Sequence, residues 1–240
     1  MRDFDPPVII NCRDRVTPLR ALVEWLERAV HERIILLDNA STYEPLIEYL
    51  ATSPHTVHRL RRNLGSRALW ADTLIEFFRH KWFVYTDPDV LPIDDCPFDA
   101  VDRLRQALEL HSERTKAALG LYLDDLPADH RVGEWERRLL APLATDEWRG
   151  YVGKVDQIEV FDSLSDTTFA LYRPGSPFRL QALRLGWPYQ LRHGDWYKEG
   201  LPLSDEDAYY LERAEGANTA PDSETPLDGH IIGSSWKDTV

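Results

Sequence analysis

Two aspartates separated by one residue follow a hydrophobic stretch of this chain, and their closeness raises a question of charge. Asp87 and Asp89 come directly after residues 83–86, FVYT, and Pro88 stands between them. Carboxylates this close repel each other, so a positive group lies between them, or one is protonated, or both face open water. Hard divalent cations bind carboxylate oxygens, so a metal site is one interpretation. Solvated acids without chemistry are another.

Residues 87–90, DPDV, match the start of the D-x-D-x-[TV] pattern of phosphatases of the haloacid-dehalogenase type. In that family the nucleophile follows the first strand of the fold. Here three strand–helix units come before Asp87, so the sequence disfavours a phosphatase.

The elements that must position these acids alternate between strand and helix. Short apolar stretches predict four strands, at residues 8–10, 34–37, 56–60 and 81–86. Apolar side chains three and four residues apart predict three helices between them, at 17–30, 41–50 and 68–78. Such alternation is typical of a mostly parallel sheet with helices on both faces, which makes the fold class α/β.

Polar residues follow each of these four strands. They are Asn11 and Arg13, Asp38 and Asn39, Asn63 and Gly65, and Asp87 and Asp89. In open sheets of parallel strands, ligands bind at the carboxyl ends of the strands. We therefore expect a binding crevice along one edge of the sheet.

Two of the helix starts have capping signals. Thr17 offers a hydroxyl directly before Pro18, where the missing N–H costs nothing, and Ser41 and Glu44 have the spacing of a capping box. We expect Thr17 and Ser41 to cap these helices.

The second half of the chain has a different texture. A helix is predicted over 99–111, an antiparallel strand over 166–173 and a last helix over 204–213, and turns are predicted at Pro174-Gly175 and Gly186-Trp187-Pro188. We expect one domain over 1–213, made of a first half, 1–92, that carries the crevice and a second half, 93–213. A partly mobile tail, 214–240, would follow.

The totals exclude some classes of partner. The formal net charge is −13, from 41 acidic and 28 basic residues, which disfavours a nucleic-acid partner. Cys12 and Cys96 are too few for a disulfide framework and fit a reducing compartment, so we predict a cytoplasmic protein without a signal peptide or transmembrane segment. One basic cluster stands out in this acidic chain and either helps to bind a diphosphate or is a solvated face: His58, Arg59, Arg61, Arg62 and Arg67.

Taken together, four segments of the first half resemble the glycosyltransferases of the GT-A fold, close to the broad family 2 type. They are 8–15 (VIINCRDR), 35–41 (ILLDNAS), 63–65 (NLG) and 86–89 (TDPD). The resemblance implies a Rossmann-like, mostly parallel sheet flanked by helices, with an antiparallel acceptor-side part toward the C-terminus. It also implies that 1–92 is a nucleotide-binding half and 93–213 an acceptor half. The chain departs from the family at 66–70, SRALW, where glycine and alanine are usual, and it lacks the downstream Glu-Asp and Gln-x-x-Arg-Trp motifs.

The resemblance also implies roles for residues. Asp38 would bind the base of a nucleotide, Asp87 its ribose, and Asp89 would hold Mn²⁺ or Mg²⁺ against the diphosphate. The other polar residues at the strand ends would line the nucleotide: Asn11, Arg13, Asn39, Asn63 and Gly65. By analogy with GT-A enzymes that complete the metal site with a late histidine, His193 would be a further ligand. A purely structural histidine is the alternative.

A second acid pair, Asp124 and Asp125, follows a predicted strand over 117–123. An inverting transferase needs a carboxylate that takes the proton of the acceptor hydroxyl. We predict Asp125 as this base and Asp124 as the residue that orients the acceptor, because Asp125 lies nearer the turn at Leu126-Pro127. Mutual repulsion should raise the pKa of the two carboxyls. A loop cap or a salt-bridged surface pair is the alternative.

The sequence thus predicts a metal-dependent, inverting glycosyltransferase that uses a UDP- or dTDP-linked sugar donor and a glycan or other hydroxyl-bearing acceptor. A non-catalytic nucleotide- or carbohydrate-binding protein with the same fold is the alternative. A nucleotidyltransferase is disfavoured, because residues 11–15, NCRDR, contain no glycine after the first strand.

Overall fold

The computed structural model describes residues 4–140, 150–198 and 201–213 of the 240-residue chain. The predicted tail, 214–240, lies outside the described residues. The strands are β1 (Val8–Cys12), β2 (Ile34–Asp38), β3 (Thr56–Arg59), β4 (Phe83–Thr86), β5 (Val90–Pro92), β6 (Lys116–Leu121), β7 (Gly150–Val155), β8 (Ile158–Leu164), β9 (Ala170–Tyr172) and β10 (Gln181–His193). The helices are α1 (Thr17–Arg28), α2 (Glu44–Thr52), α3 (Ala68–Ala71), α4 (Ile75–Phe78), α5 (Ala100–Leu110), α6 (Arg131–Leu140), the 3-10 helix η1 (Gly194–Tyr197) and α7 (Asp205–Arg213).

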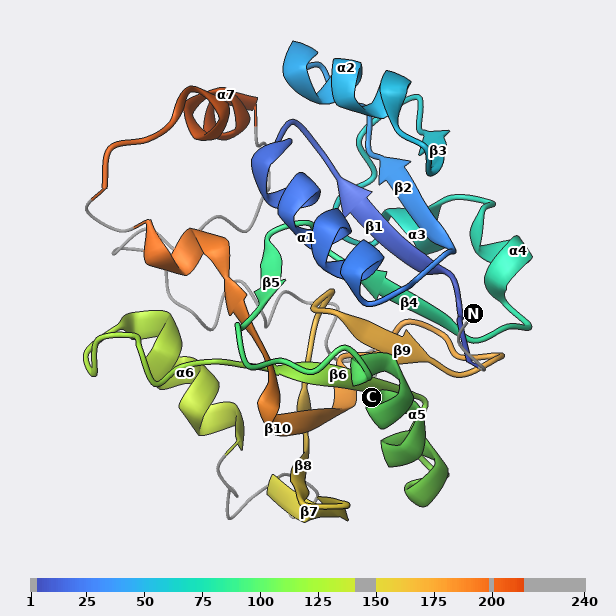
Figure 1. Cartoon of the computed structure of the whole chain (residues 1–240), viewed down its shortest axis with the longest axis vertical. Helices are drawn as coiled ribbons and strands as arrows, with labels where there is room; N and C mark the ends of the chain where they lie inside the picture. The colour runs from blue at the N-terminus through green and yellow to red at the C-terminus, as the bar shows by residue number, and fades with distance from the viewer. Residues whose placement is uncertain (1–3, 141–149, 199–200, 214–240) are drawn as a thin grey trace.

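The described strands form one mixed sheet with helices against it (Figure 1). Their order is β3-β2-β1-β4-β9-β6-β10-β8-β7, and β5 pairs with β10. β1 is parallel to β2 and β4, β2 is parallel to β3, and β6 is parallel to β10. Because β9 is antiparallel to both β4 and β6, these two also run in one direction. The prediction of an α/β fold with a mostly parallel sheet and an antiparallel later part is confirmed.

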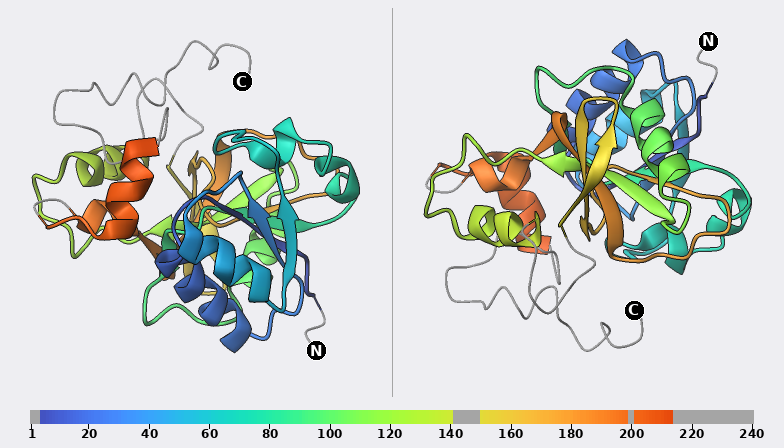
Figure 2. Two further views of the ribbon diagram at one scale, coloured as in Figure 1. Left: turned by 90° about the horizontal axis from the view of Figure 1, so that it is seen from above. Right: turned by 90° about the horizontal axis from the view of Figure 1, so that it is seen from below.

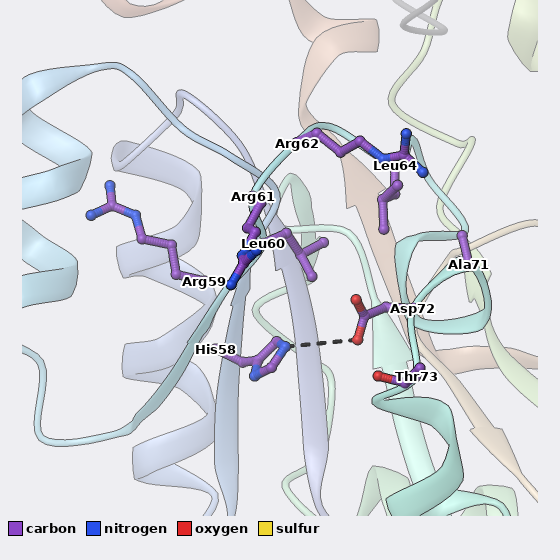
Figure 3. A pocket seen from close by; sticks show the side chains of 9 residues that line it. All are labelled: His58, Arg59, Leu60, Arg61, Arg62, Leu64, Ala71, Asp72 and Thr73. Carbon is purple, nitrogen blue, oxygen red and sulfur yellow. Dashed lines mark ion pairs between the residues drawn. The ribbon is translucent and has the colours of Figure 1, made fainter.

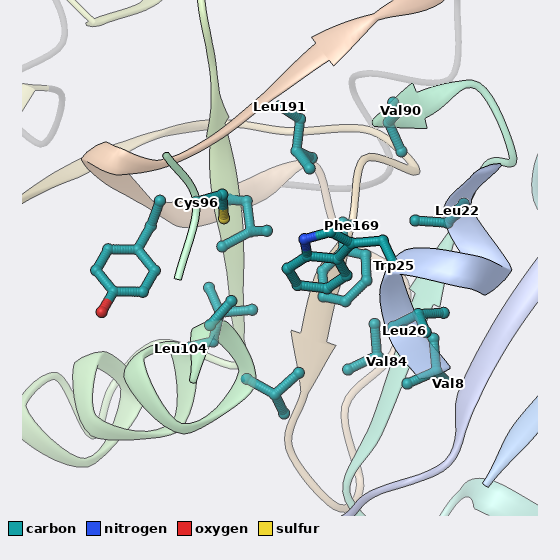
Figure 4. Packing of buried hydrophobic residues seen from close by; sticks show 14 of the residues in the cluster. Val8, Leu22, Trp25, Leu26, Val84, Val90, Cys96, Leu104, Phe169 and Leu191 are labelled. Atoms are coloured by element: carbon teal, nitrogen blue, oxygen red, sulfur yellow. The ribbon is translucent and has the colours of Figure 1, made fainter. Parts of the chain in front are cut away.

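The core fills both faces of the sheet, and β1 shows why its sequence is continuously apolar. Every residue of β1 is buried, with Val8 and Ile10 in one hydrophobic cluster and Ile9 in the other. On the first face, Trp25 of α1 meets Phe169 edge to face, with ring centroids 6.3 Å apart (Figure 4). Figure 2 shows helices on both sides of the strands. Burial on both faces keeps the strand ends as the places where polar side chains can gather.

The predicted helix over 68–78 is wrong as a single element. The structure has two short helices there, α3 and α4, and Asp72 has an extended backbone between them. The Leu74 N–H donates to Asp72 Oδ1 at 2.8 Å, a side-chain turn that replaces a helical backbone bond.

The predicted turn at Gly186-Trp187-Pro188 is also wrong, since these residues lie inside β10. Against β6, the register of β10 jumps between Leu185 and Gln190, so the strand takes up the extra residues as a bulge and continues. Proline is compatible with a bulge because no ladder hydrogen bond is required there. This continuation brings His193 to the edge of the sheet where β6 ends.

The predicted caps at Thr17 and Ser41 are replaced by carboxylates from elsewhere in the chain. Neither α1 nor α2 has a side-chain bond from its own cap residue. Glu206 of α7 accepts the N–H groups of Val16 and Thr17 at the start of α1. Asp14 Oδ1 accepts the N–H groups of Thr42 and Tyr43 before α2, at 2.6 and 2.9 Å.

Among the described residues, no helix combines the length and apolar character that crossing a membrane requires.

Candidate active site

The carboxyl ends of β1, β4 and β10 meet in a cluster of buried and half-buried charged side chains. Arg15, three residues after β1, donates from Nη2 to Asp89 Oδ2 at 2.8 Å and from Nη1 to Asp195 Oδ1 at 2.6 Å. His193, the last residue of β10, has Nδ1 at 3.8 Å from Asp89 Oδ2. The predicted convergence of polar strand ends therefore includes residues from both halves of the chain.

Arg15 and His193 set the charge state of Asp89, whose side chain is 6% exposed. Burial opposes ionisation, but the interactions with His193 and then Arg15 outweigh it and lower the pKa of Asp89 to about 2. The sequence left three alternatives for the acid pair: a positive group beside the acids, a protonated acid, or acids that face water. Asp89 fits the first, because two basic side chains lie beside it.

Asp87 has the opposite environment, two residues away. Its carboxylate accepts the hydroxyl of Thr167, and its N–H donates to the Thr167 carbonyl at 3.1 Å. Burial, and then the charge of Asp89, raise the pKa of Asp87 well above its usual range, although the Thr167 hydroxyl partly offsets this. Asp87 therefore fits the second alternative, a carboxyl that is readily protonated.

Asp89, His193 and Asp195 could together hold a metal ion. Each offers one ligand atom, and these atoms lie within 4.8 Å of one another. His193 Nδ1 is buried and makes no hydrogen bond within the described part of the chain, while its ring stacks on Trp196 with centroids 5.0 Å apart. An imidazole nitrogen that is held in place beside two carboxylates and makes no hydrogen bond fits a divalent cation, so the residues present could hold one.

Two asparagines hold the loop over residues 63–66 against the ends of β1 and β2. Asn39 accepts the Leu64 N–H at 2.7 Å and donates to the Gly65 carbonyl at 2.9 Å, and Asn11 donates to the same carbonyl at 3.3 Å. Asn63 accepts the Gly65 N–H, and Gly65 has a φ of 76°, which favours glycine. The structure thus brings Asn11, Asn39, Asn63 and Gly65 together as predicted by their positions after the strands.

Asp38 is fully buried, and both of its oxygens have partners within the chain. Oδ1 accepts the Ser41 N–H at 2.9 Å, and Oδ2 accepts Nε of Arg59 at 2.8 Å. Binding of a base would require a ligand to replace Arg59 on Oδ2, because the Ser41 bond belongs to the turn itself. The role of Asp38 stays a prediction.

Arg13 lies at the same edge, beneath α7. Its Nη2 donates at 3.1 Å to the carbonyl oxygen of Arg213, which is the last residue of α7. One end of α7 therefore covers this predicted nucleotide-binding residue.

The second acid pair lies at the end of β6, and the structure separates its members by their partners. Asp125 accepts Nε of Arg192 at 2.7 Å and the Tyr197 hydroxyl at 2.6 Å. Although burial acts in the other direction, these two partners lower its pKa, so the expectation of a raised value is wrong for Asp125. Asp124 is exposed. A cation and a hydroxyl donor act on Asp125 more strongly than its like-charged neighbour does.

Four members of the basic cluster, all except Arg67, line a separate pocket of about 540 Å³ at the outer strand of the sheet, β3 (Figure 3). Leu60 and Leu64 give it apolar surface, and His58 pairs with Asp72 at 3.8 Å across it. Figure 3 shows Arg59 pointing away from Asp72. Its Nε pairs with Asp38 at 2.8 Å instead. Arg61 and Arg62 are exposed. None of these cations contacts Asp89 in the described structure.

Four residues in or beside this charged cluster were not predicted from the sequence: Arg15, Asp195, Glu206 and Tyr210. Arg15 and Asp195 stand inside segments with predicted ligands, four residues after Asn11 and two after His193. Their proximity to those residues was the only available signal. Glu206 and Tyr210 had none, because α7 reaches α1 across nearly the whole length of the chain.

Comparison with models of known protein families finds no match, and comparison with curated proteins finds none either. Among solved structures, the chain is similar to residues 1–349 of TarS from S. aureus, with 10% identity, a TM-score of 0.45, and coverage of 94% of this chain and 77% of that one. A second S. aureus TarS structure has 11% identity and a TM-score of 0.42, over 91% of this chain and 41% of that one. A putative glucose-1-phosphate thymidylyltransferase from Bacillus anthracis, in complex with a sucrose, has 12% identity and a TM-score of 0.35, over 87% and 83%. These likenesses are too distant to bear on activity.

Proposed function

We propose that this protein is a metal-dependent glycosyltransferase. It would move a sugar from a UDP- or dTDP-linked donor to a hydroxyl of a glycan or another acceptor, with inversion. The observation that carries the proposal is the group of the buried Asp89 with the half-buried His193 and Asp195, at the edge where β1, β4 and β10 end. Ligands of α/β sheets bind at this edge, and this donor set suits Mn²⁺ or Mg²⁺.

The proposed donor site combines this group with the strand ends beside it. Asp89, His193 and Asp195 would hold the cation, which when bound neutralises charge on the leaving diphosphate. Asn11, with a buried Oδ1 that has no partner among the described residues, and the loop over 63–66 would line the nucleotide. Asp87 would bind the ribose and Asp38 the base, as the resemblance implies. Arg13 and Asn39 would also line the nucleotide.

The proposed base is Asp125, with Asp124 orienting the acceptor. Asp125 takes the proton of the acceptor hydroxyl, and that oxygen attacks the anomeric carbon of the donor. The bond from this carbon to the diphosphate breaks, and its electron pair goes to the phosphate oxygen, which inverts the anomeric centre. One observation supports the choice: Arg192 and Tyr197 hold the orientation of the Asp125 carboxylate. The same two partners lower the pKa of Asp125 and so make it a weaker base than the sequence predicts.

A melting-temperature screen of nucleotides, with and without Mn²⁺, tests the donor site. Ligand that binds the native state raises the melting temperature by mass action, so UDP or dTDP should raise it only with the metal. Equal shifts in excess EDTA would count against a metal-held diphosphate. Slow hydrolysis of the sugar donor should accompany binding. Binding without hydrolysis or transfer would favour the non-catalytic alternative.

A further inference from the structure

Arg15 occupies the same carboxylates that a cation would use. Its guanidinium bridges Asp89 and Asp195 at 2.8 and 2.6 Å, and its side chain is 6% exposed. Asp89 Oδ2, which accepts Arg15, is also the oxygen that lies 3.8 Å from His193 Nδ1. The positive charge of Arg15 thus already sits against the ligand group proposed for the metal.

We infer that Arg15 and a divalent cation exclude each other at this site, and that α7 is the latch that keeps Arg15 there. The inference deepens the proposed function and rests on it. A cation at about 2.1 Å from a carboxylate oxygen would lie beside a guanidinium bonded to the same carboxylate. Two like charges in a buried site repel strongly, since little water screens them. Loading the cation therefore requires Arg15 to leave.

Helix α7 fixes Arg15 from the opposite side. The Tyr210 ring lies 4.2 Å from the Arg15 guanidinium carbon. Glu206 accepts the N–H groups of the two residues that follow Arg15, Val16 and Thr17. Lys198 joins the cluster to α7, because its Nζ lies 3.2 Å from Asp195 and 2.5 Å from Asp207.

The same helix covers the proposed nucleotide edge. The Tyr209 hydroxyl donates to Thr42 Oγ1 at 3.1 Å, and its ring lies 5.0 Å from that of Tyr43. Arg13 is bonded to the Arg213 carbonyl at the end of α7. A donor that uses Arg13 and the loops after β1 and β2 would meet α7 in this position.

Helix α7 is attached in a way that permits release. Its one buried side chain is Glu206, and Leu211 is 42% exposed. Figure 1 shows α7 apart from the sheet, beside the start of α1. Polar bonds and ring contacts with little apolar burial are typical of segments that open at low cost. We therefore describe two states: a closed state with α7 docked and Arg15 between the acids, and an open state with the acids free for a cation and Arg15 free to pair with the diphosphate.

Mn²⁺ binding to altered α7 tests the latch. The test variant is Glu206→Gln with Tyr210→Ala, which removes the negative charge that accepts the Val16 and Thr17 N–H groups and the ring beside the Arg15 guanidinium, and so weakens both contacts. The matched control is Glu212→Gln with Leu211→Ala on the same helix, where Glu212 pairs only with Arg213 among the described residues. Titration of each protein with Mn²⁺ alone, followed by electron paramagnetic resonance of the free ion, should show binding tighter by about fivefold or more in the test variant and unchanged in the control. Arg15→Gln should also bind Mn²⁺ more tightly.

Unchanged or weaker Mn²⁺ binding in a test variant with a native circular dichroism spectrum would overturn the inference, as would equal tightening in the control. Hydrogen exchange on the unaltered protein gives a second reading. Backbone amides of residues 205–213 should exchange faster in the presence of Mn²⁺ and UDP or dTDP than in their absence. If the protein binds metal and nucleotide but this exchange is unchanged, the inference about α7 is wrong while the proposed function stands. If the unaltered protein, the test variant and the matched control all show no metal-dependent nucleotide binding, the proposed function is wrong as well.

Discussion

The ends of β4 and β6 each carry two neighbouring acids, in opposite surroundings. The Asp89 side chain at the end of β4 is 6% exposed, whereas that of Asp125 after β6 is 34% exposed. In the buried pair, Asp89 ionises only because His193 and Arg15 face it, and the pKa of Asp87 is raised. For Asp125, burial acts in the other direction, but the Tyr197 hydroxyl and Arg192 lower the pKa. A buried acid pair depends on its counter-charges and suits an ion site, while an exposed acid is available to an acceptor.

The largest expected effect is at the exposed end. Asp125→Asn should reduce sugar transfer roughly 10²–10⁴-fold, the usual contribution of general base catalysis. Nucleotide and Mn²⁺ binding, measured by calorimetry, should stay unchanged, because Asp125 does not contact the acid cluster. Asp124→Asn should reduce the rate of sugar transfer much less than Asp125→Asn does. Full activity of Asp125→Asn, or a product with retained configuration, would remove Asp125 from the mechanism.

At the buried end the loss should appear in binding. Asp89→Asn should weaken metal-dependent UDP or dTDP binding by roughly 1.5–3 kcal/mol, the range for one bond to a charged group. Calorimetry with Mn²⁺ or with EDTA measures this. Asp95→Asn, an exposed acid after β5, is the control and should bind as the unaltered protein does. Equal affinities for the two variants would show that Asp89 does not hold the ion.

Asp87→Asn should stabilise the fold while it weakens ribose binding. With a raised pKa, the native state keeps its proton above the pH at which the unfolded carboxyl releases it, about 3.9. The native state thus loses stability as pH rises from there through the raised pKa, and asparagine removes that loss. A gain on the order of 1 kcal/mol at pH 7–8 is expected. Melting curves from pH 4 to 8 should diverge as pH rises, and a uniform loss of stability would contradict the assignment.

The smallest effect concerns the fine setting of Asp125. The Tyr197 hydroxyl lowers the pKa of this carboxyl, so Tyr197→Phe should raise it. Because a base works only when ionised, the acidic limb of the pH–rate profile should move to higher pH, by less than about one unit. Tyr122→Phe keeps the ring that packs near Arg192 and serves as the control. A limb that moves equally in both variants would assign it to another group.

Much of the first half could be predicted from the sequence because its signals are local. Apolar strands such as Val8–Cys12 are continuous where both faces of the sheet are covered, and polar residues follow them. The caps failed for a tertiary reason: Glu206 and Asp14 supply the acceptors that Thr17 and Ser41 were expected to give. The turn at 186–188 failed because pairing with β6 and β8 holds β10 extended around a bulge.

The sequence by itself determined the α/β class, the direction of the first strands and the presence of acids at their ends, because hydrophobic period and strand polarity are properties of short segments. Only the tertiary structure decided what those acids face. Arg15 comes from the loop after β1, His193 and Asp195 from the end of β10, and Tyr210 from α7, and no local pattern relates them. Charge states depend on burial and on such neighbours, so the difference between Asp87, Asp89 and Asp125 arises only when the chain is folded.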